Sequence, residues 1–168
     1  MPIFGDNTPG GDTFPCSDDR ALFALFTLPV DGDITQMNVI FDTSSTAGSN
    51  AKALIYSDVA GNPSVLLAAS AGVAVPGGGG DITFPMTVSL PAGDYWLGCV
   101  TDSFQCVFDG DTGSGVRIES FTYASPQDPV SGTIDGKAFQ LDVYATYDIP
   151  APPPSGLPTY PVSSELYF

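Results

Sequence analysis

Histidine is absent from this chain of 168 residues, and basic residues are scarce. Without histidine the chain lacks the commonest general base and the commonest transition-metal ligand, which argues against most hydrolases and metalloenzymes. Only 4 Lys and Arg stand against 19 Asp and Glu, so the formal net charge is −15. Nucleic acids are bound by clustered cations, and four scattered basic residues therefore exclude a nucleic-acid partner.

Long apolar runs are also missing. No segment approaches the roughly 18 apolar residues that a membrane-spanning helix needs. The first residues, MPIFGDNTPGGDTF, contain neither the basic region nor the apolar region of a signal peptide. We therefore expect a soluble chain with no export signal and no membrane partner.

Cysteine is rare, and the count of 3 leaves at least one thiol unpaired within the chain. Cys99 and Cys106 flank a turn between two short β-like stretches, so a disulfide between them is geometrically conceivable. Three reduced cysteines that act as small apolar residues are the alternative. A zinc site is excluded because the thiols lack a CxxC spacing and no histidine could complete the ligand set.

Glycine and proline are abundant, with 19 and 16 residues, and they separate short stretches that alternate in polarity or are rich in β-branched and aromatic residues. About eight or nine short strands between turns are typical of antiparallel sandwiches and barrels. We predict an all-β fold, an antiparallel, jelly-roll-like β-sandwich over residues 20–148. The expected core residues are Phe26, Phe41, Ile55, Tyr56, Phe84, Trp96, Leu97, Phe108, Phe139, Leu141 and Val143.

The last expected strand, FQLDVYATY at residues 139–147, shows the alternation of a half-buried strand. Leu141 and Val143 share its apolar face with Phe139, Ala145 and Tyr147. Asp142 falls on the opposite face, which we expect to be in contact with water.

Both ends of the chain have the composition of extended arms. Residues 149–168 include six prolines between Pro150 and Pro161, and proline removes backbone donors and favours polyproline II. A disordered tail and an arm that docks on a partner are both compatible with this composition; the apolar last residues favour docking. Residues 1–19 are a second expected arm. The expected partner contacts are Pro150, Pro152, Pro153, Pro154, Tyr160, Leu166, Tyr167 and Phe168.

The acidic residues are mainly aspartates of turns, since 17 of the 19 are Asp. Asp31, Asp33, Asp109 and Asp111 are weak candidates for a calcium site on a loop, although the chain lacks the pattern of an EF-hand. No spacing selects a carboxylate pair for glycoside hydrolysis, and the chain has no nucleophile elbow or phosphate-binding loop. We therefore expect no catalytic residues, no cofactor and no enzyme activity.

Sugar stacking is the other binding chemistry that we considered. Carbohydrate-binding sandwiches use exposed aromatic side chains, and Tyr95, Tyr123 and Tyr144 are the candidates for that role. Trp96 lies beside Leu97 in an expected strand, which favours a place in the core.

Three segments together resemble a known β-sandwich module. They are RALFALFTLPVDGDITQMNVIF at residues 20–41, KALIYSDVAGNPSVLLAAS at residues 52–70, and LPAGDYWLG at residues 90–98, closed by FQLDVYATY. The module recurs in tailed-phage virion proteins and in surface proteins of bacteria and archaea, and the resemblance covers roughly residues 4–148. It implies adhesion, display or decoration and carries over no catalytic residue.

In that setting an acidic sandwich without an export signal resembles a virion protein assembled in the host cytoplasm. We expect a non-enzymatic phage structural protein, a capsid decoration (cement) protein that binds the major capsid protein or another virion protein at the outer head surface. The resemblance also implies a homo-oligomer, with a trimer as one form. The alternative is a glycan- or receptor-binding module of a phage fibre, a phage tail or a cell surface.

Overall fold

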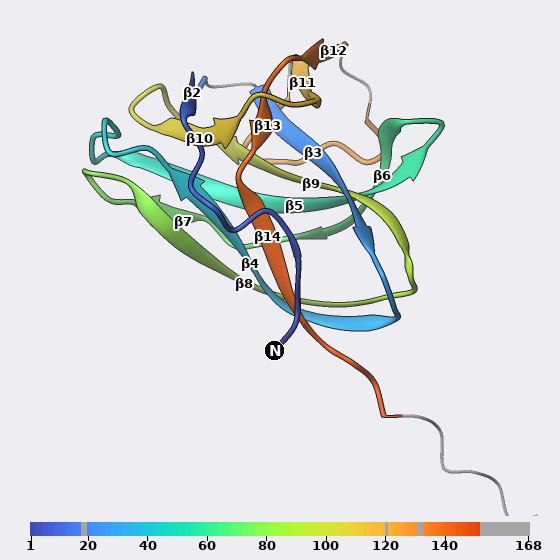
Figure 1. Ribbon diagram of the computed structural model, residues 1–168. Helices are drawn as coiled ribbons and strands as arrows, with labels where there is room; N and C mark the ends of the chain where they lie inside the picture. The colour runs from blue at the N-terminus through green and yellow to red at the C-terminus, as the bar shows by residue number, and fades with distance from the viewer. Residues whose placement is uncertain (18–19, 120, 131–132, 152–168) are drawn as a thin grey trace, which may run out of the picture.

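The computed structural model describes residues 1–17, 20–119, 121–130 and 133–151. Within these residues the chain forms fourteen β-strands and no helix (Figure 1). Every strand pairing is antiparallel, and the strands form two sheets of seven. The predicted all-β antiparallel sandwich is confirmed. The described residues include no helix with the length and apolar character required to cross a membrane.

The first sheet, here called sheet A, is built around the long strand β4. Its main path follows the order β1-β14-β4-β10-β13, while β8 pairs with β4 and β2 pairs with β10. The strands are β1 (Ile3–Gly5), β2 (Asp12–Pro15), β4 (Gly32–Phe41), β8 (Gly80–Leu90), β10 (Val107–Asp111), β13 (Gln140–Leu141) and β14 (Val143–Asp148).

The second sheet, sheet B, has the order β12-β11-β3-β9-β5-β6, with β7 paired to β5. Its strands are β3 (Arg20–Leu28), β5 (Ser49–Val59), β6 (Asn62–Ala69), β7 (Val73–Val75), β9 (Gly93–Thr101), β11 (Gly115–Glu119) and β12 (Ile134–Lys137). The sequence predicts eight or nine strands, and the additional ones are short strands such as β1, β2, β7 and β13.

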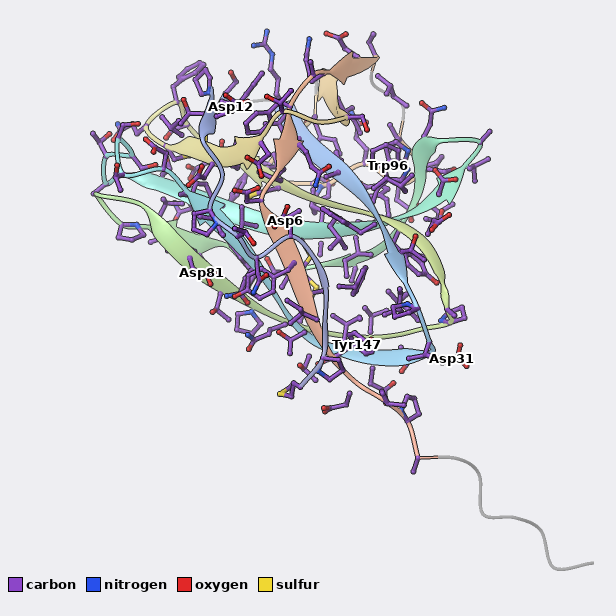
Figure 2. The ribbon with its side chains drawn as sticks, viewed as in Figure 1. Asp6, Asp12, Asp31, Asp81, Trp96 and Tyr147 are labelled. Atoms are coloured by element: carbon purple, nitrogen blue, oxygen red, sulfur yellow. A yellow bond between two sulfur atoms is a disulfide. The ribbon has the colours of Figure 1, made fainter. Side chains whose placement is uncertain are left out.

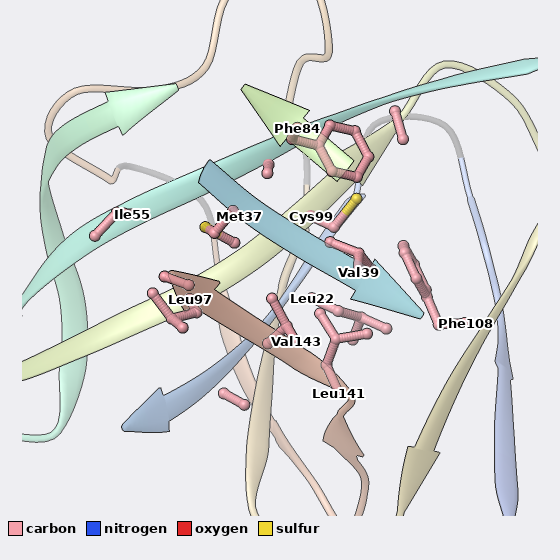
Figure 3. Packing of buried hydrophobic residues seen from close by; sticks show 14 of the residues in the cluster. Leu22, Met37, Val39, Ile55, Phe84, Leu97, Cys99, Phe108, Leu141 and Val143 are labelled. Atoms are coloured by element: carbon pink, nitrogen blue, oxygen red, sulfur yellow. The ribbon is translucent and has the colours of Figure 1, made fainter. Parts of the chain in front are cut away.

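The main core lies between the two sheets and draws side chains from both (Figure 3). On β9, for example, Leu97 and Cys99 face this core, whereas Trp96 and Val100 belong to a second cluster. All but one of the predicted core residues are buried. The exception is Phe26, which is partly buried at the edge of the main core.

The second cluster covers the outer face of sheet B. It joins Phe23, Tyr56 and Trp96 to Phe121, which belongs to the described segment 121–130. The Tyr56 hydroxyl donates to the Gln127 carbonyl, and the Leu66 amide donates to the Asp128 carboxylate at 3.1 Å. Sheet B is therefore covered on both faces, which explains why β3 reads as the nearly continuous apolar run ALFALFTL rather than as a strict alternation.

The N-terminal segment does not extend away from the sandwich, and the prediction of an arm needs correction for the described residues 1–17. Ile3 to Gly5 pair with Thr146 to Tyr144 of β14, and Asp12 to Pro15 pair with Gly110 to Val107 of β10. Between these strands the chain crosses the face of sheet A (Figure 1). The composition of the segment does not indicate these pairings, because the partner strands β14 and β10 are distant in the sequence.

Neither cysteine state considered from the sequence, a Cys99–Cys106 disulfide or three reduced thiols, is found. Cys106 is bonded to Cys16, with the two Cα atoms 5.4 Å apart, and Cys99 is a buried free thiol. The register of β2 on β10 places Pro15 opposite Val107 and so brings Cys16 opposite Cys106. Cys99 points into the main core instead, and burial raises the pKa of its thiol.

Candidate functional site

The most unusual side chain of the described structure is Asp142, which occupies the single residue between β13 and β14. Its amide donates to the Asp109 carbonyl at 3.1 Å, and its carbonyl accepts from the Ile40 amide at 3.0 Å. These bonds hold the Asp142 backbone between β10 and β4. Its side chain points away from the main core, because Leu141 and Val143 on either side face inward.

The N-terminal segment covers this side chain. The Asp6 amide donates to the Val143 carbonyl at 2.9 Å, and the Gly10 amide donates to Oδ2 of Asp142 at 2.6 Å. Gly10 must approach sheet A closely, since a Cβ there would lie 2.0 Å from the carbonyl oxygen of Gly110. Asp142 is 0% exposed as a result. The strand alternation is as predicted, but the expectation that Asp142 contacts water is wrong.

Asp142 lies among other carboxylates. One carboxylate oxygen each from Asp6, Asp111 and Asp142 lie within 4.8 Å of one another. Asp6 follows β1, and its side chain is half-buried. Asp111 is the last residue of β10, and its side chain is exposed. The Gly11 amide lies 3.4 Å from Oδ1 of Asp111, so the same N-terminal segment contacts two members of the group. We call these three residues the Asp6 cluster; Figure 2 labels Asp6 where the N-terminal segment crosses β14.

If all three carboxylates of the cluster were ionised, their negative charges would repel one another. Oδ1 of Asp142 is buried and has no hydrogen-bond partner among the described residues. Burial raises the pKa of Asp142 to about 7, the Gly10 amide opposes this rise, and the charges of Asp6, Asp109 and Asp111 add to it. The arrangement can hold a proton on Asp142 or a cation between the carboxylates.

The predicted calcium candidates separate into two places. Asp111 joins the Asp6 cluster, and Asp109 lies near it, with Oδ1 accepting from the Gly110 amide at 3.0 Å. Asp31 lies far from it, at the turn before β4 (Figure 2), and Asp33 is the second residue of β4. Oδ1 of Asp31 accepts from the Ala92 amide at 2.8 Å, and Asp33 accepts from the Ser89 hydroxyl. Asp31 is therefore a turn residue, whereas Asp33 lies within a strand.

Sequence analysis missed Asp6 and Asp142 as members of one site. A charged residue in the middle of FQLDVYATY is the only local signal, because aspartate is disfavoured in strands. Nothing in the sequence indicates that Asp6, 136 positions earlier (142 − 6), covers it.

A second feature is one end of the sandwich, at which the first residues lie beside the end of β14 and several apolar side chains are exposed. The Tyr147 amide donates to the Pro2 carbonyl, and Asp148 pairs with Asp33, so the first residues, the start of β4 and the end of β14 lie at the same end of the sandwich. Met1, Val30 and Ile149 are exposed there by 74%, 42% and 63%. We call these three residues the apolar end.

An open cleft of about 260 Å³ adjoins the apolar end. It is lined by Asp31, Gly32, Asp33, Ser89, Leu90, Pro91 and Pro150. Pro150 is thus the one predicted partner contact that the structure describes, and it lines the cleft. The other predicted contacts, Pro152, Pro153, Pro154, Tyr160, Leu166, Tyr167 and Phe168, lie outside the described residues.

The three tyrosines named for sugar stacking are not brought together. Tyr95 is buried in the main core, and its hydroxyl donates to the Pro91 carbonyl at 2.8 Å. Tyr123 packs on the outer face of sheet B, with the Lys52 ammonium 4.6 Å from its ring centroid. Tyr144 lies on β14 and donates to Asp81 at 2.6 Å. Trp96 is buried as predicted, and its indole N–H donates to Asp58 at 2.8 Å.

Comparison of the chain with protein-family models, with curated proteins and with solved structures yields no significant match. The resemblance drawn from residues 20–41, 52–70 and 90–98 therefore stays a prediction.

Proposed function

We propose that this protein is a non-enzymatic virion structural protein, a capsid decoration protein that binds the major capsid protein at the outer surface of a phage head. The observation that carries the proposal is the apolar end. A strongly acidic protein exposes Met1, Val30 and Ile149 at one end of the sandwich, where the Pro-rich segment begins. Apolar side chains gathered beside polar residues mark surfaces that bind other proteins.

The charge of the chain supports the same proposal. A net charge of −15 keeps free subunits apart in solution, because like charges repel. Binding to a larger particle then has to come from a local apolar contact and from groups on the partner that complement the aspartates beside the cleft. The proposed protein is a homo-oligomer on the particle, with a trimer as the form to test.

The disulfide supports a role outside the cell. Disulfides persist in oxidising surroundings, including virion surfaces, whereas the cytoplasm keeps thiols reduced. The Cys16–Cys106 bond is buried and fixes β2 against β10. We infer that the protein assembles in the host cytoplasm and acts on the released virion surface with this bond formed.

Catalysis is a weaker proposal for the Asp6 cluster. Burial raises the pKa of Asp142 to about 7, but the N-terminal segment covers this side chain fully. A substrate could reach Asp142 only after that segment had moved. Sugar binding is weaker too, because two of the three candidate tyrosine hydroxyls are held by described partners and the rings lie on different faces.

The test is a pair of matched substitutions. Val30→Asp places a charge in the apolar end, and Val59→Asp places the same charge on a valine that is 58% exposed at the β5–β6 hairpin. Purified variants are mixed with capsids of the phage whose genome encodes the protein, and occupancy is measured by co-sedimentation. We expect Val30→Asp to weaken binding about tenfold or more, the effect of losing one central interface side chain.

Both valines are exposed, so neither change should alter stability by more than about 0.5 kcal/mol. Val59→Asp should bind as wild type does. Equal binding of the two variants would remove the apolar end from the mechanism, and a lack of any capsid binding by the wild-type protein would refute the proposed function.

Deletion of residues 150–168 tests the Pro-rich segment, since unchanged occupancy would show that it is dispensable.

A further inference from the structure

The Asp6 cluster has the geometry of a cation site. Calcium binds oxygen ligands at about 2.3–2.6 Å, so two ligands on opposite sides of one ion lie roughly 5 Å apart at most. The three carboxylate oxygens lie within 4.8 Å of one another and therefore fit around a single ion. They come from three separate elements, which are the segment after β1, the end of β10 and the β13–β14 junction.

A second observation points to a ligand at the same place. Asp142 is 0% exposed, and its Oδ1 has no donor among the described residues although Oδ2 accepts from Gly10. A buried acceptor without a partner costs about 1–3 kcal/mol, and more when it is charged. The charges that act on Asp142 are those of Asp6, Asp109 and Asp111, all negative. A bound cation would satisfy the orphaned oxygen and neutralise this repulsion.

The donor set selects the type of cation. Carboxylate oxygens are hard ligands that suit calcium and magnesium, whereas zinc and copper favour imidazole and thiolate. The chain has no histidine, and the free thiol of Cys99 faces the main core on sheet B. Magnesium demands a near-ideal octahedron, while calcium accepts irregular sets of six to eight oxygens. The exposed side of Asp111 leaves room for water ligands on calcium.

We propose that Asp6, Asp111 and Asp142 bind one calcium ion, which ties the N-terminal segment to the face of sheet A. The segment between Asp6 and Gly11 contacts the sheet through the Gly10 and Gly11 amides, and both of these amides donate to carboxylates of the cluster. Calcium adds a bond between Asp6 and the two sheet residues. It therefore stabilises the pairing of β1 with β14.

The experiment is a thermal unfolding titration of the full-length protein, first treated with EDTA and dialysed, with CaCl2 as the only added ligand. Asp142→Asn removes the central charge, and Asp31→Asn is the matched control because Asp31 also accepts one backbone amide. At a calcium concentration about 100 times the dissociation constant, the wild-type Tm should rise by about 5–10 °C. Asp31→Asn should show the same rise, and Asp142→Asn less than a fifth of it.

A direct readout separates calcium binding from general stabilisation. Hydrogen exchange at the Gly10 amide, which donates to Asp142, should slow at least tenfold in calcium in the wild-type protein and stay unchanged in Asp142→Asn. No Tm rise in the wild-type protein at 10 mM CaCl2, about ten times the weakest dissociation constants of calcium sites in proteins, would overturn the proposal. An equal rise in Asp142→Asn would place the ion elsewhere, and an equal or larger rise with MgCl2 would overturn the choice of calcium.

Discussion

Replacing Asp142 by Asn should stabilise the calcium-free protein at neutral pH. The folded structure raises the pKa of Asp142 from 3.8 to about 7, mainly by burial, and the nearby negative charges add to the rise. One pKa unit corresponds to about 1.4 kcal/mol, so the ionised carboxylate costs the folded state up to about 4 kcal/mol at pH 7.5. Asparagine has nearly the same shape and no charge. Its amide oxygen can still accept from Gly10, and its neutral amide removes the repulsion from Asp6 and Asp111, each of which has a carboxylate oxygen within 4.8 Å of one on Asp142.

The neutral hydrogen bond to Gly10 is weaker than the one to a carboxylate by about 1 kcal/mol, so the expected net gain is up to about 3 kcal/mol. The gain depends on pH in a defined direction. Between pH 4 and pH 7 the folded wild-type protein keeps a proton on Asp142 that the unfolded chain has released. Unfolding then releases a proton, and wild-type stability from this group falls as pH rises through that window and levels off above it. The Asn variant lacks this dependence.

Urea unfolding in EDTA, followed by tryptophan fluorescence at pH 4.5 and pH 7.5, measures both quantities. The two proteins should have similar free energies of unfolding at pH 4.5, and the variant should be more stable by about 3 kcal/mol at pH 7.5. Comparing the two proteins cancels the effect of the other acidic residues on the pH dependence. A variant that is less stable at pH 7.5, or a difference that does not change with pH, would refute the account of Asp142 as a buried carboxylate with a raised pKa.

Two further predictions concern the sandwich itself. Replacing Cys16 and Cys106 by serine opens a loop with a sequence separation of 90 residues and should cost about 4–5 kcal/mol in urea unfolding at pH 7.5; a loss below about 1 kcal/mol would contradict the cross-link. Gly98→Ala should cost about 3 kcal/mol, because the new Cβ would lie 2.1 Å from the ring of Phe23. Gly136→Ala is its control, since a Cβ there meets nothing within 4 Å, and equal losses in the two variants would refute the reasoning.

The strands and the core follow from local pattern. In FQLDVYATY the alternation assigns Leu141, Val143 and Tyr147 to the buried face, and all three are buried. Phe26 differs because Leu25 and Thr27 on either side are exposed, and it lies near the end of β3, where it is only partly buried against the main core. A period of two identifies the face of a strand but not how much of that face the neighbouring elements cover.

The site depends on contacts that no local pattern contains. Asp142 lies on the predicted face, but the N-terminal segment covers that face, and a glycine at position 10 is what allows the close approach. Cys106 is paired with Cys16 because β2 lies on β10 in one register, and register is set by tertiary packing. Turn chemistry, in contrast, is local, and Asp31 is a turn residue, as most aspartates of the chain are expected to be.

The copy number of this chain on purified particles of the phage that encodes it tests the proposed function most directly. Quantitative mass spectrometry of particles washed free of soluble protein measures its ratio to the major capsid protein. We predict a fixed stoichiometric ratio for the wild-type chain, a lower ratio for Val30→Asp and an unchanged ratio for Val59→Asp. Absence of the chain from the particles, or a few copies confined to the tail, would contradict capsid decoration.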